Sequence, residues 1–281
     1  MNPWLRVGPL VLVLLAVGGV SSSAQQPFEK ARDWKPLFRG IDLVDLQAEQ
    51  PRLMRGHAVR IDLTTKGLRF FATPSNGERP DHTDGLKTST FLTRYKCQLA
   101  INASPFSPIH KEEGQPQKIE GLTISEGKVV SPERLAYPAL LITKDNRVAI
   151  RRPPFQLEDI HTAVSGFGIV LEKGQVIKGG KDVHPRTAAG ISQDGKTLYF
   201  LVIDGRQPKY SEGATTSEVG EWLAALGAFD GINLDGGGTT TLVIEKAGGF
   251  HVVNRPIHGG QPGTERVAAS HLGVFAPPLE K

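Results

Sequence analysis

Four polar clusters in the sequence contain the residue types that enzymes use to bind anions and cleave bonds. They are Asn102 to Phe106, His184 to Thr187, Asp204 to Arg206, and Asn233 to Thr241. Each cluster lies at the end of an apolar segment of strand length, and strand ends are where a rigid scaffold presents functional groups. We therefore expect these clusters to supply the catalytic and binding residues of one site.

The cluster from Asn233 to Thr241 is the most informative. Asp235 ends an apolar strand, and Gly236, Gly237 and Gly238 follow it. Because glycines lack side-chain bulk, a ligand can approach their backbone N–H groups closely while the carboxylate stays fixed on its strand. The same glycines also suit a simple β-turn or bulge, and the glycine run alone does not separate the two interpretations.

Two carboxylates and two cationic side chains are candidates for catalysis. Asp204 and Asp235 each follow an apolar strand, and paired carboxylates are the usual equipment for cleaving a glycosidic bond, although both could simply cap turns. Arg186 has a planar fork suited to phosphate or carboxylate, and Pro185 stiffens its segment. His184 could act as an acid, a base or a phosphate donor. The alternatives are a surface ion pair for Arg186 and a structural role for His184.

Metal chemistry stays open on these residues. Asp204, Asp235, Asn233 and His184 could hold a divalent cation, but their spacing matches no metal-site signature, so no cofactor is firmly implied and the metal ligands are unknown. The sequence contains no HExxH motif. The segment 163–167 lacks the flanking glycines of a hydrolase nucleophile elbow, which argues against a Ser-His-Asp enzyme.

Composition narrows the function further. The chain has 281 residues, and 33 Lys and Arg against 29 Asp and Glu give a net charge of +4 without a long basic run. A nucleic-acid partner therefore receives no support. Cys97 is the only cysteine, which excludes an intrachain disulfide, a CxxC redox pair and a multi-cysteine zinc site.

The amino terminus has the pattern of a secretory signal peptide. Arg6 precedes an apolar stretch at 10–20, and small residues from Ser21 lead to a predicted cleavage after Ala24. The stretch is shorter than the roughly 20 residues that span a bilayer, so no stable membrane span is expected after cleavage; the alternative is a retained anchor. A secreted chain with one cysteine favours a bacterial periplasm or the cell exterior.

The mature chain is predicted to form one domain at 58–281, after a polar lead-in at 25–57 with one early strand at most. Alternating residues at 59–63 and the apolar run at 68–72 predict a hairpin around Lys66-Gly67. Helical spacing predicts a helix at 88–95, followed by a short buried strand at 97–101.

Turn residues between apolar segments predict three more hairpins, around 145–146, 173–174 and 194–195. The longest predicted helix is 216–227, with Ser217 as its N-terminal cap and Gly227 as its C-terminal cap, and it leads into a strand at 231–235. Many antiparallel strands with a few helices predict an α+β fold, a single domain of mixed, largely antiparallel β-sheet.

Four segments together resemble the phosphodiester glycosidase family, and the resemblance extends from about residue 60 onward. They are His184 to Ala188, Val202 to Arg206, Ile232 to Thr240, and Leu272 to Phe275, in the family's order. Two sites depart from the family pattern: Asn102 to Phe106 replaces the more frequent Asn-Gly-Gly-Phe-Phe, and Ser270 stands where Asn is common. These departures bear on substrate preference more than on fold.

The resemblance implies a hydrolase that cleaves the glycosidic bond of a sugar-1-phosphodiester, leaving the phosphate on its other partner. It makes Asp235 the nucleophile or base and Asp204 its partner, with Arg186 and His184 stabilising the departing phosphate. The predicted binders of sugar or phosphate are Asn102, Thr187, Arg206, Asn233, Gly236, Gly237, Gly238 and Thr239. We expect these groups to converge on one pocket.

Two other functions stay open at this stage. A noncatalytic envelope protein could bind exported polysaccharide in the same glycine-lined cleft, and a metal-dependent phosphodiesterase could break the P–O bond instead of the C–O bond. In each case the expected partner is a sugar-phosphate or polysaccharide.

Overall fold

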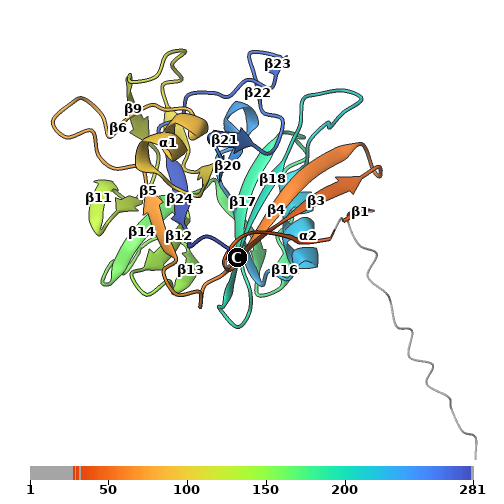
Figure 1. Ribbon diagram of the computed structural model, residues 1–281, viewed down its shortest axis with the longest axis horizontal. Helices are drawn as coiled ribbons and strands as arrows, with labels where there is room; N and C mark the ends of the chain where they lie inside the picture. The colour runs from red at the N-terminus through yellow and green to blue at the C-terminus, as the bar shows by residue number, and fades with distance from the viewer. Residues whose placement is uncertain (1–27, 29, 32, 280–281) are drawn as a thin grey trace, which may run out of the picture.

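Antiparallel β-sheets make up most of the structure (Figure 1). The computed structural model describes residues 28, 30–31 and 33–279. Within this part of the chain, a nine-stranded sheet, called the large sheet, accompanies two five-stranded sheets, called the second and third sheets. The predicted α+β class is right in kind, but the fold is β-dominated, with two α-helices among the described residues.

The large sheet has the strand order β1-β3-β4-β18-β17-β19-β15-β16, with β2 paired to β3. Its strands are β1 (Lys30–Ala31), β2 (Lys35–Phe38), β3 (Ile41–Ala48), β4 (Met54–Asp62), β15 (Gly168–Glu172), β16 (Gln175–Val176), β17 (Arg186–Ile191), β18 (Thr197–Ile203) and β19 (Asp230–Asn233).

The second sheet has the order β21-β20-β7-β24-β5 and the third β11-β10-β14-β12-β13. Their strands are β5 (Arg69–Ala72), β7 (Leu99–Asn102), β20 (Leu242–Lys246), β21 (Gly249–Val252) and β24 (His271–Phe275), then β10 (Thr123–Ser125), β11 (Lys128–Ser131), β12 (Ala139–Thr143), β13 (Val148–Arg151) and β14 (Ile160–Ser165). Smaller elements are β6 (Thr83–Asp84), β8 (Phe106–Ser107) and β9 (Pro116–Ile119), the hairpin of β22 (Ile257–His258) and β23 (Gln261–Pro262), and the 3-10 turn η1 (Gly237–Thr239).

A hydrophobic core at the centre of the molecule is shared by all three sheets. Val202 of β18, Ile101 of β7 and Val164 of β14 are buried in it. Successive side chains of a strand point to opposite faces, so Leu201 packs instead into the cluster beneath the second α-helix. Both faces of β18 are therefore covered, which explains why its residues 198–203 are continuously apolar.

The second α-helix, α2 (Thr216–Leu226), lies against the outer face of the large sheet, where Trp222 is fully buried. Gly227 ends the helix with a φ of 105°, as predicted. The predicted cap, Ser217, is wrong by two positions. Thr215 accepts a hydrogen bond from the Glu218 N–H, and the Glu218 carboxylate accepts from the Thr215 N–H, which is a reciprocal capping box.

Several sequence predictions for the domain are confirmed. The helix at 88–95 is α1 (Thr88–Tyr95), which packs on the second sheet. The three hairpins around 145–146, 173–174 and 194–195 join β12 to β13, β15 to β16 and β17 to β18.

The hairpin predicted around Lys66-Gly67 is wrong. The strand before this turn, β4, pairs with β3 and β18, whereas the strand after it, β5, pairs with β24. The turn thus passes from the large sheet to the second sheet. Both strands supply apolar residues to the same central core, so their sequence pattern alone resembles that of a hairpin.

The segment 25–57 contains more strand than its polar composition predicts. Three whole strands, β1, β2 and β3, and the start of β4 fall within it, and Ile41 and Val44 are buried. The predicted signal peptide at 1–24 lies outside the described residues. Among the helices that the structure describes, none is long and apolar enough to cross a membrane.

Candidate active site

The ends of β7, β17 and β19 are tied together around Asp235. Asn102 closes β7, and its side-chain amide nitrogen donates to the Asp235 backbone oxygen at 2.7 Å. Its Oδ1 accepts from the Thr187 hydroxyl at 2.7 Å and from the Thr241 N–H at 3.1 Å. The Asp235 N–H donates to the backbone oxygen of Ala103 at 2.8 Å. Asp235 is therefore anchored to the large and second sheets at once.

The sequence predicts that Asn102 binds sugar or phosphate. In the structure its side chain instead contacts the residues that hold Asp235. It is fully buried, and its amide nitrogen also contacts the Thr239 hydroxyl oxygen at 3.3 Å. An asparagine amide has two donor hydrogens and one oxygen with two lone pairs, so these contacts use its whole capacity. Thr187 is likewise buried and committed to Asn102. Both residues position the segment that carries Asp235.

The environment of Asp235 raises the pKa of its carboxyl group toward neutral pH. Burial raises the pKa of Asp235 to about 6, while the Thr239 hydroxyl, the Gly236 N–H and the charge of Arg266 partly oppose this rise by favouring the ionised form. The Thr239 oxygen lies 2.7 Å from Asp235 Oδ2. A carboxylate with a raised pKa and specific polar partners is typical of a functional site, and it can act as a base or nucleophile at neutral pH.

The three glycines at 236–238, called the glycine turn, make room for two arginines. A Cβ atom on Gly238 would lie 2.4 Å from Cζ of Arg266, and one on Gly237 would lie 3.1 Å from a terminal nitrogen of Arg206. Gly237 also has a φ of 65°, which favours glycine. Its N–H donates to the Pro185 backbone oxygen at 2.9 Å and is not presented to a ligand. The glycine run therefore brings guanidinium groups close to Asp235.

Arg206 and His184 form the first of two matched pairs beside the glycine turn. The Arg206 guanidinium donates to His184 Nδ1 at 3.3 Å. Burial and the charges of Arg206 and Arg186 lower the pKa of His184, so its ring is neutral at pH 7 with the proton on Nε2. The Arg206 backbone has a φ of 58°, a conformation that is costly outside glycine and concentrates at functional sites.

Arg266 and His258 form the second pair, and the sequence predictions missed both. Arg266 Nε donates to His258 Nδ1 at 3.1 Å, and burial together with the Arg266 charge lowers the pKa of His258. Arg266 is attracted by Asp235 and repelled by Arg206. Two guanidinium groups thus lie near each other, with the Asp235 carboxylate acting on Arg266, and the excess positive charge suits a bound anion such as phosphate. No motif marks these residues in the sequence, although the missing side chains of the glycine turn are an indirect signal.

Asp204 has a different role from the predicted partner of Asp235. It is 1% exposed. Its two carboxylate oxygens accept from the Asn254 side chain at 2.8 Å, from the Arg255 N–H at 3.0 and 3.1 Å, and from the Tyr210 hydroxyl at 3.2 Å. Burial raises the pKa of Asp204 despite these bonds. Its oxygens are engaged by the protein, so we assign it the structural task of joining the 204–211 loop to the 254–255 segment.

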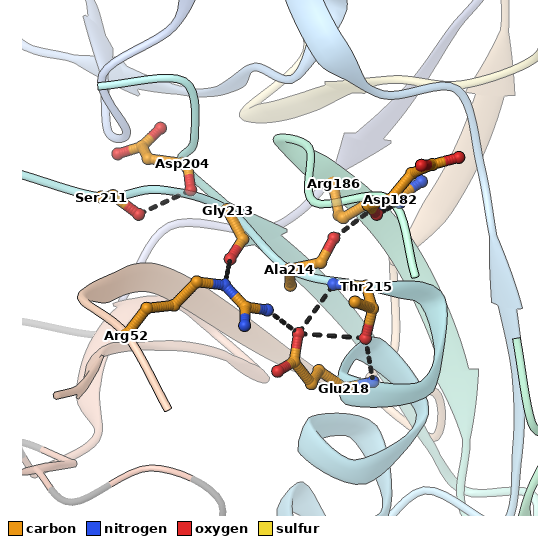
Figure 2. Close-up of polar contacts among 9 residues, drawn as sticks. All are labelled: Arg52, Asp182, Arg186, Asp204, Ser211, Gly213, Ala214, Thr215 and Glu218. Carbon is orange, nitrogen blue, oxygen red and sulfur yellow. Dashed lines mark hydrogen bonds and ion pairs between the residues drawn. The ribbon is translucent and has the colours of Figure 1, made fainter. Parts of the chain in front are cut away.

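The Arg186 side chain also makes structural contacts, to backbone oxygens. Figure 2 shows its side chain beside the start of α2, where Nε donates to the Ala214 backbone oxygen at 2.8 Å and a terminal nitrogen donates to the Asp182 backbone oxygen at 2.6 Å. Neighbouring side chains on β17 point to opposite faces, so Thr187 points toward Asn102 and Arg186 toward α2. The Arg186 fork therefore contacts backbone oxygens beside α2, although its charge still acts on His184 and Arg206.

Asn233 is buried at the end of β19, where its amide nitrogen donates to the Leu234 backbone oxygen at 3.0 Å.

Two open hollows, of about 530 and 500 Å³, lie along β12 and β13 and contain none of the predicted site residues. Among the described residues, no group of three or more His, Cys, Asp and Glu side chains is arranged to hold a metal ion. The residues brought together are thus Asp235, Thr239, the glycine turn, His184 and Arg206, joined by Arg266 and His258.

Comparisons with known proteins identify the family of the chain and its fold. The sequence profile of the phosphodiester glycosidase family matches residues 95–275. The fold is similar to that of the zebrafish N-acetylglucosamine-1-phosphodiester alpha-N-acetylglucosaminidase catalytic domain, described as auto-inhibited by its pro-peptide, with a TM-score of 0.61 and 18% identity over 88% of this chain and 87% of that chain.

Two bacterial proteins have similar folds. A protein described as exported, from Burkholderia pseudomallei, has a TM-score of 0.59 and 14% identity over 79% of this chain and 74% of that chain. A protein of unassigned function from Synechocystis has a TM-score of 0.55 and 13% identity over 85% of this chain and 62% of that chain. Among curated proteins, no sequence matches this chain.

Proposed function

Because the chain belongs to the phosphodiester glycosidase family, we propose that it hydrolyses the glycosidic bond of a sugar-1-phosphodiester and releases the sugar and a phosphomonoester. One observation carries this proposal: Asp235, with a pKa of about 6, lies beside Arg266 on a glycine turn that also receives the Arg206 guanidinium. The site combines a carboxylate for the anomeric carbon with two cations for the phosphate.

Arg206 and Arg266 would stabilise the leaving group. A phosphodiester carries one negative charge, and breaking the C–O bond leaves the electron pair on the bridging oxygen, so the departing monoester gains a second charge. Guanidinium groups already in place beside that oxygen stabilise the transition state more than the ground state. His184 and His258 accept from these arginines through Nδ1 and hold them in orientation.

Asp235 would act in its ionised form, which predominates at pH 7 because its pKa is about 6. It either attacks the anomeric carbon or takes a proton from the water that does so, and both routes place the carboxylate next to the sugar. A phosphomonoester leaves readily without a proton from the enzyme. A second catalytic carboxylate is thus dispensable, in agreement with the commitment of Asp204 to other partners.

The proposed location is the bacterial periplasm or the cell exterior, after removal of residues 1–24. This proposal rests on the sequence pattern of the amino terminus, and one protein of similar fold is described as exported. Cell fractionation followed by amino-terminal sequencing tests it. A mature chain beginning at Gln25 in the periplasm or medium is expected, and an uncleaved chain in the cytoplasm would contradict it.

The reaction is tested by incubating the purified protein with a panel of sugar-1-phosphodiesters in 18O-labelled water, with and without a chelator. A glycosidase places the label on the anomeric hydroxyl of the released sugar. Label in the phosphomonoester would instead show P–O cleavage and overturn the proposal. Loss of activity with the chelator would reveal a metal requirement.

The roles of the arginines are tested with a matched set of lysine variants. Arg206→Lys and Arg266→Lys retain the charge but lose the planar fork, and each should lower kcat/KM on the phosphodiester by roughly 10²-fold. Arg186→Lys is the control, because the Arg186 fork binds backbone oxygens beside α2, and it should affect stability more than turnover. If Arg186→Lys alone lowered turnover, the phosphate would belong near Arg186.

A further inference from the structure

Tyr137 and Phe167 form an exposed aromatic pair beside the candidate active site. Their ring centroids lie 6.2 Å apart at an interplanar angle of 50°. Phe167 is 53% exposed, although large apolar side chains of this fold are mostly buried, and Tyr137 is half-buried. The rings therefore present apolar faces to the solvent from two different segments, the loop between β11 and β12 and the link between β14 and β15.

The backbone connects this aromatic pair closely to Asp235. The Phe167 N–H donates to the Asn233 backbone oxygen at 2.8 Å, and Asn233 is two residues before Asp235, at most about 7 Å of extended chain. On the same side, the Ser165 N–H donates to the Ser104 hydroxyl at 3.0 Å, two residues after Asn102. The strand ends that hold Asp235 thus also hold Phe167.

Both rings are carried by a closely packed backbone. A Cβ atom on Gly121 would lie 2.8 Å from Cβ of Tyr137, and one on Gly166 would lie 2.5 Å from the Asn233 backbone oxygen. The Gly166 N–H donates to the Pro138 backbone oxygen at 2.9 Å. Two glycines therefore let the segments of Tyr137 and Phe167 pack against the strand ends, so the rings are preorganised despite their exposure.

The surroundings of the pair favour a neutral ligand with an apolar face. The nearest charges along the chain, Arg134 before Tyr137 and Glu120 before Gly121, are paired with each other in a salt bridge, so they add no net charge. The two site arginines contact the glycine turn, which follows Asp235, whereas Phe167 contacts the chain before Asp235. The arginines that would bind phosphate thus contact the residues after Asp235, whereas the aromatic ring of Phe167 is held by the residues before it.

We propose that Tyr137 and Phe167 form the sugar-binding subsite, where the C–H face of a neutral pyranose ring stacks on the aromatic rings while the phosphate is held by the arginines. This inference rests on the proposed function, which assigns the phosphate half of the substrate to the arginines. Sugar binding by the aromatic pair can nevertheless be measured without turnover. The substrate class is then a neutral sugar linked through its C1 oxygen to phosphate.

The subsite is tested by binding of four methyl glycosides, those of glucose, galactose, mannose and N-acetylglucosamine, measured by saturation-transfer NMR and calorimetric titration. The full protein should bind at least one of them. Phe167→Ala and Tyr137→Ala should each raise its Kd by at least about fivefold, whereas Phe167→Trp should bind like the wild type. Phe250→Ala is the matched control, because Phe250 is a 48% exposed phenylalanine on β21.

Three outcomes would overturn the subsite: no methyl glycoside binds, Phe167→Ala binds as tightly as the wild type, or Phe250→Ala loses binding equally. A dimer by light scattering that Phe167→Ala dissociates, without sugar binding, would assign the rings to a second copy of the chain instead. Sugar binding that depends on Phe167 in a protein that hydrolyses no sugar-1-phosphodiester would sustain the subsite and refute the proposed function. Unfolding midpoints of all variants identify any that fail to fold. If the alanine variants fail to fold, Phe167→Trp still tests the subsite, because it should bind the sugar like the wild type.

Discussion

Asparagine in place of Asp235 is expected to stabilise the folded protein at neutral pH while it removes catalysis. Burial raises the pKa of Asp235 from 3.8 to about 6, so the charged carboxylate is less favourable in the folded protein than in the unfolded chain. Asparagine has nearly the same shape and resembles the protonated, neutral form. The variant should therefore escape a penalty that the wild type bears.

The size and pH range of the effect follow from the two pKa values. The difference between about 6 and 3.8 corresponds to about 3 kcal/mol at 1.36 kcal/mol per pKa unit. The unfolded chain releases this proton near pH 4 and the folded protein near pH 6. Because the pKa is raised on folding, the wild type loses stability as the pH rises from about 4 to 6, and the full loss is present above that range.

The assay is urea unfolding of the wild type and Asp235→Asn at unit steps from pH 4 to 8. The variant should be more stable by about 3 kcal/mol at pH 7, and this gain should fall toward zero near pH 4. Asp159→Asn, at an exposed aspartate, is the matched control for removing one negative charge. The reasoning would be refuted if Asp235→Asn gave no gain at pH 7, or a gain that persisted unchanged at pH 4.

Three further predictions test the site and its support. Gly238→Ala would bring a Cβ to 2.4 Å from Cζ of Arg266; the displaced guanidinium should lower kcat/KM by roughly tenfold or more, and an unchanged value in steady-state assays would remove Arg266 from the site. Thr215→Ala removes the cap of α2 and should cost about 1 kcal/mol in urea unfolding with normal turnover; a loss below the measurement error would contradict the capping box. The pH profile of kcat/KM should rise through about pH 6, the pKa of Asp235, because the ionised carboxylate reacts; a profile that falls there would make Asp235 an acid.

Local patterns in the sequence were sufficient for elements whose partners are close in the chain. The β17–β18 hairpin and the end of α2 at Gly227 depend on turn and cap residues within a few positions. The hairpin predicted around Lys66-Gly67 was wrong because the pairing partners of β4 and β5 are far away in sequence. Only long-range pairing separates a hairpin from a crossing between sheets.

The same limit explains which site residues were recognised. Asp235 and the glycine turn are contiguous, so their motif identifies them. Arg266 and His258 reach the site from a distant loop without a motif. Arg186 lies next to Thr187 in the sequence, but strand alternation directs the two side chains to opposite faces. A cluster of suitable residues therefore indicates one end of the sheet, and only the register of each strand decides which of its side chains lie together there.

The electrostatics of the site fit the chemistry of the proposed leaving group. Two guanidinium groups held near each other repel, and a carboxylate with a pKa of about 6 is destabilising at neutral pH, so these groups reduce the stability of the fold. A phosphodiester relieves the first cost by placing an anion between the arginines, and the second charge that forms on bond cleavage is attracted more strongly still. The departing phosphate needs no donated proton, which leaves a single carboxylate free to remain ionised. Arg206, Arg266 and Asp235 thus meet the needs of a phosphate leaving group, whereas an ordinary glycoside would require a second, protonated carboxyl group.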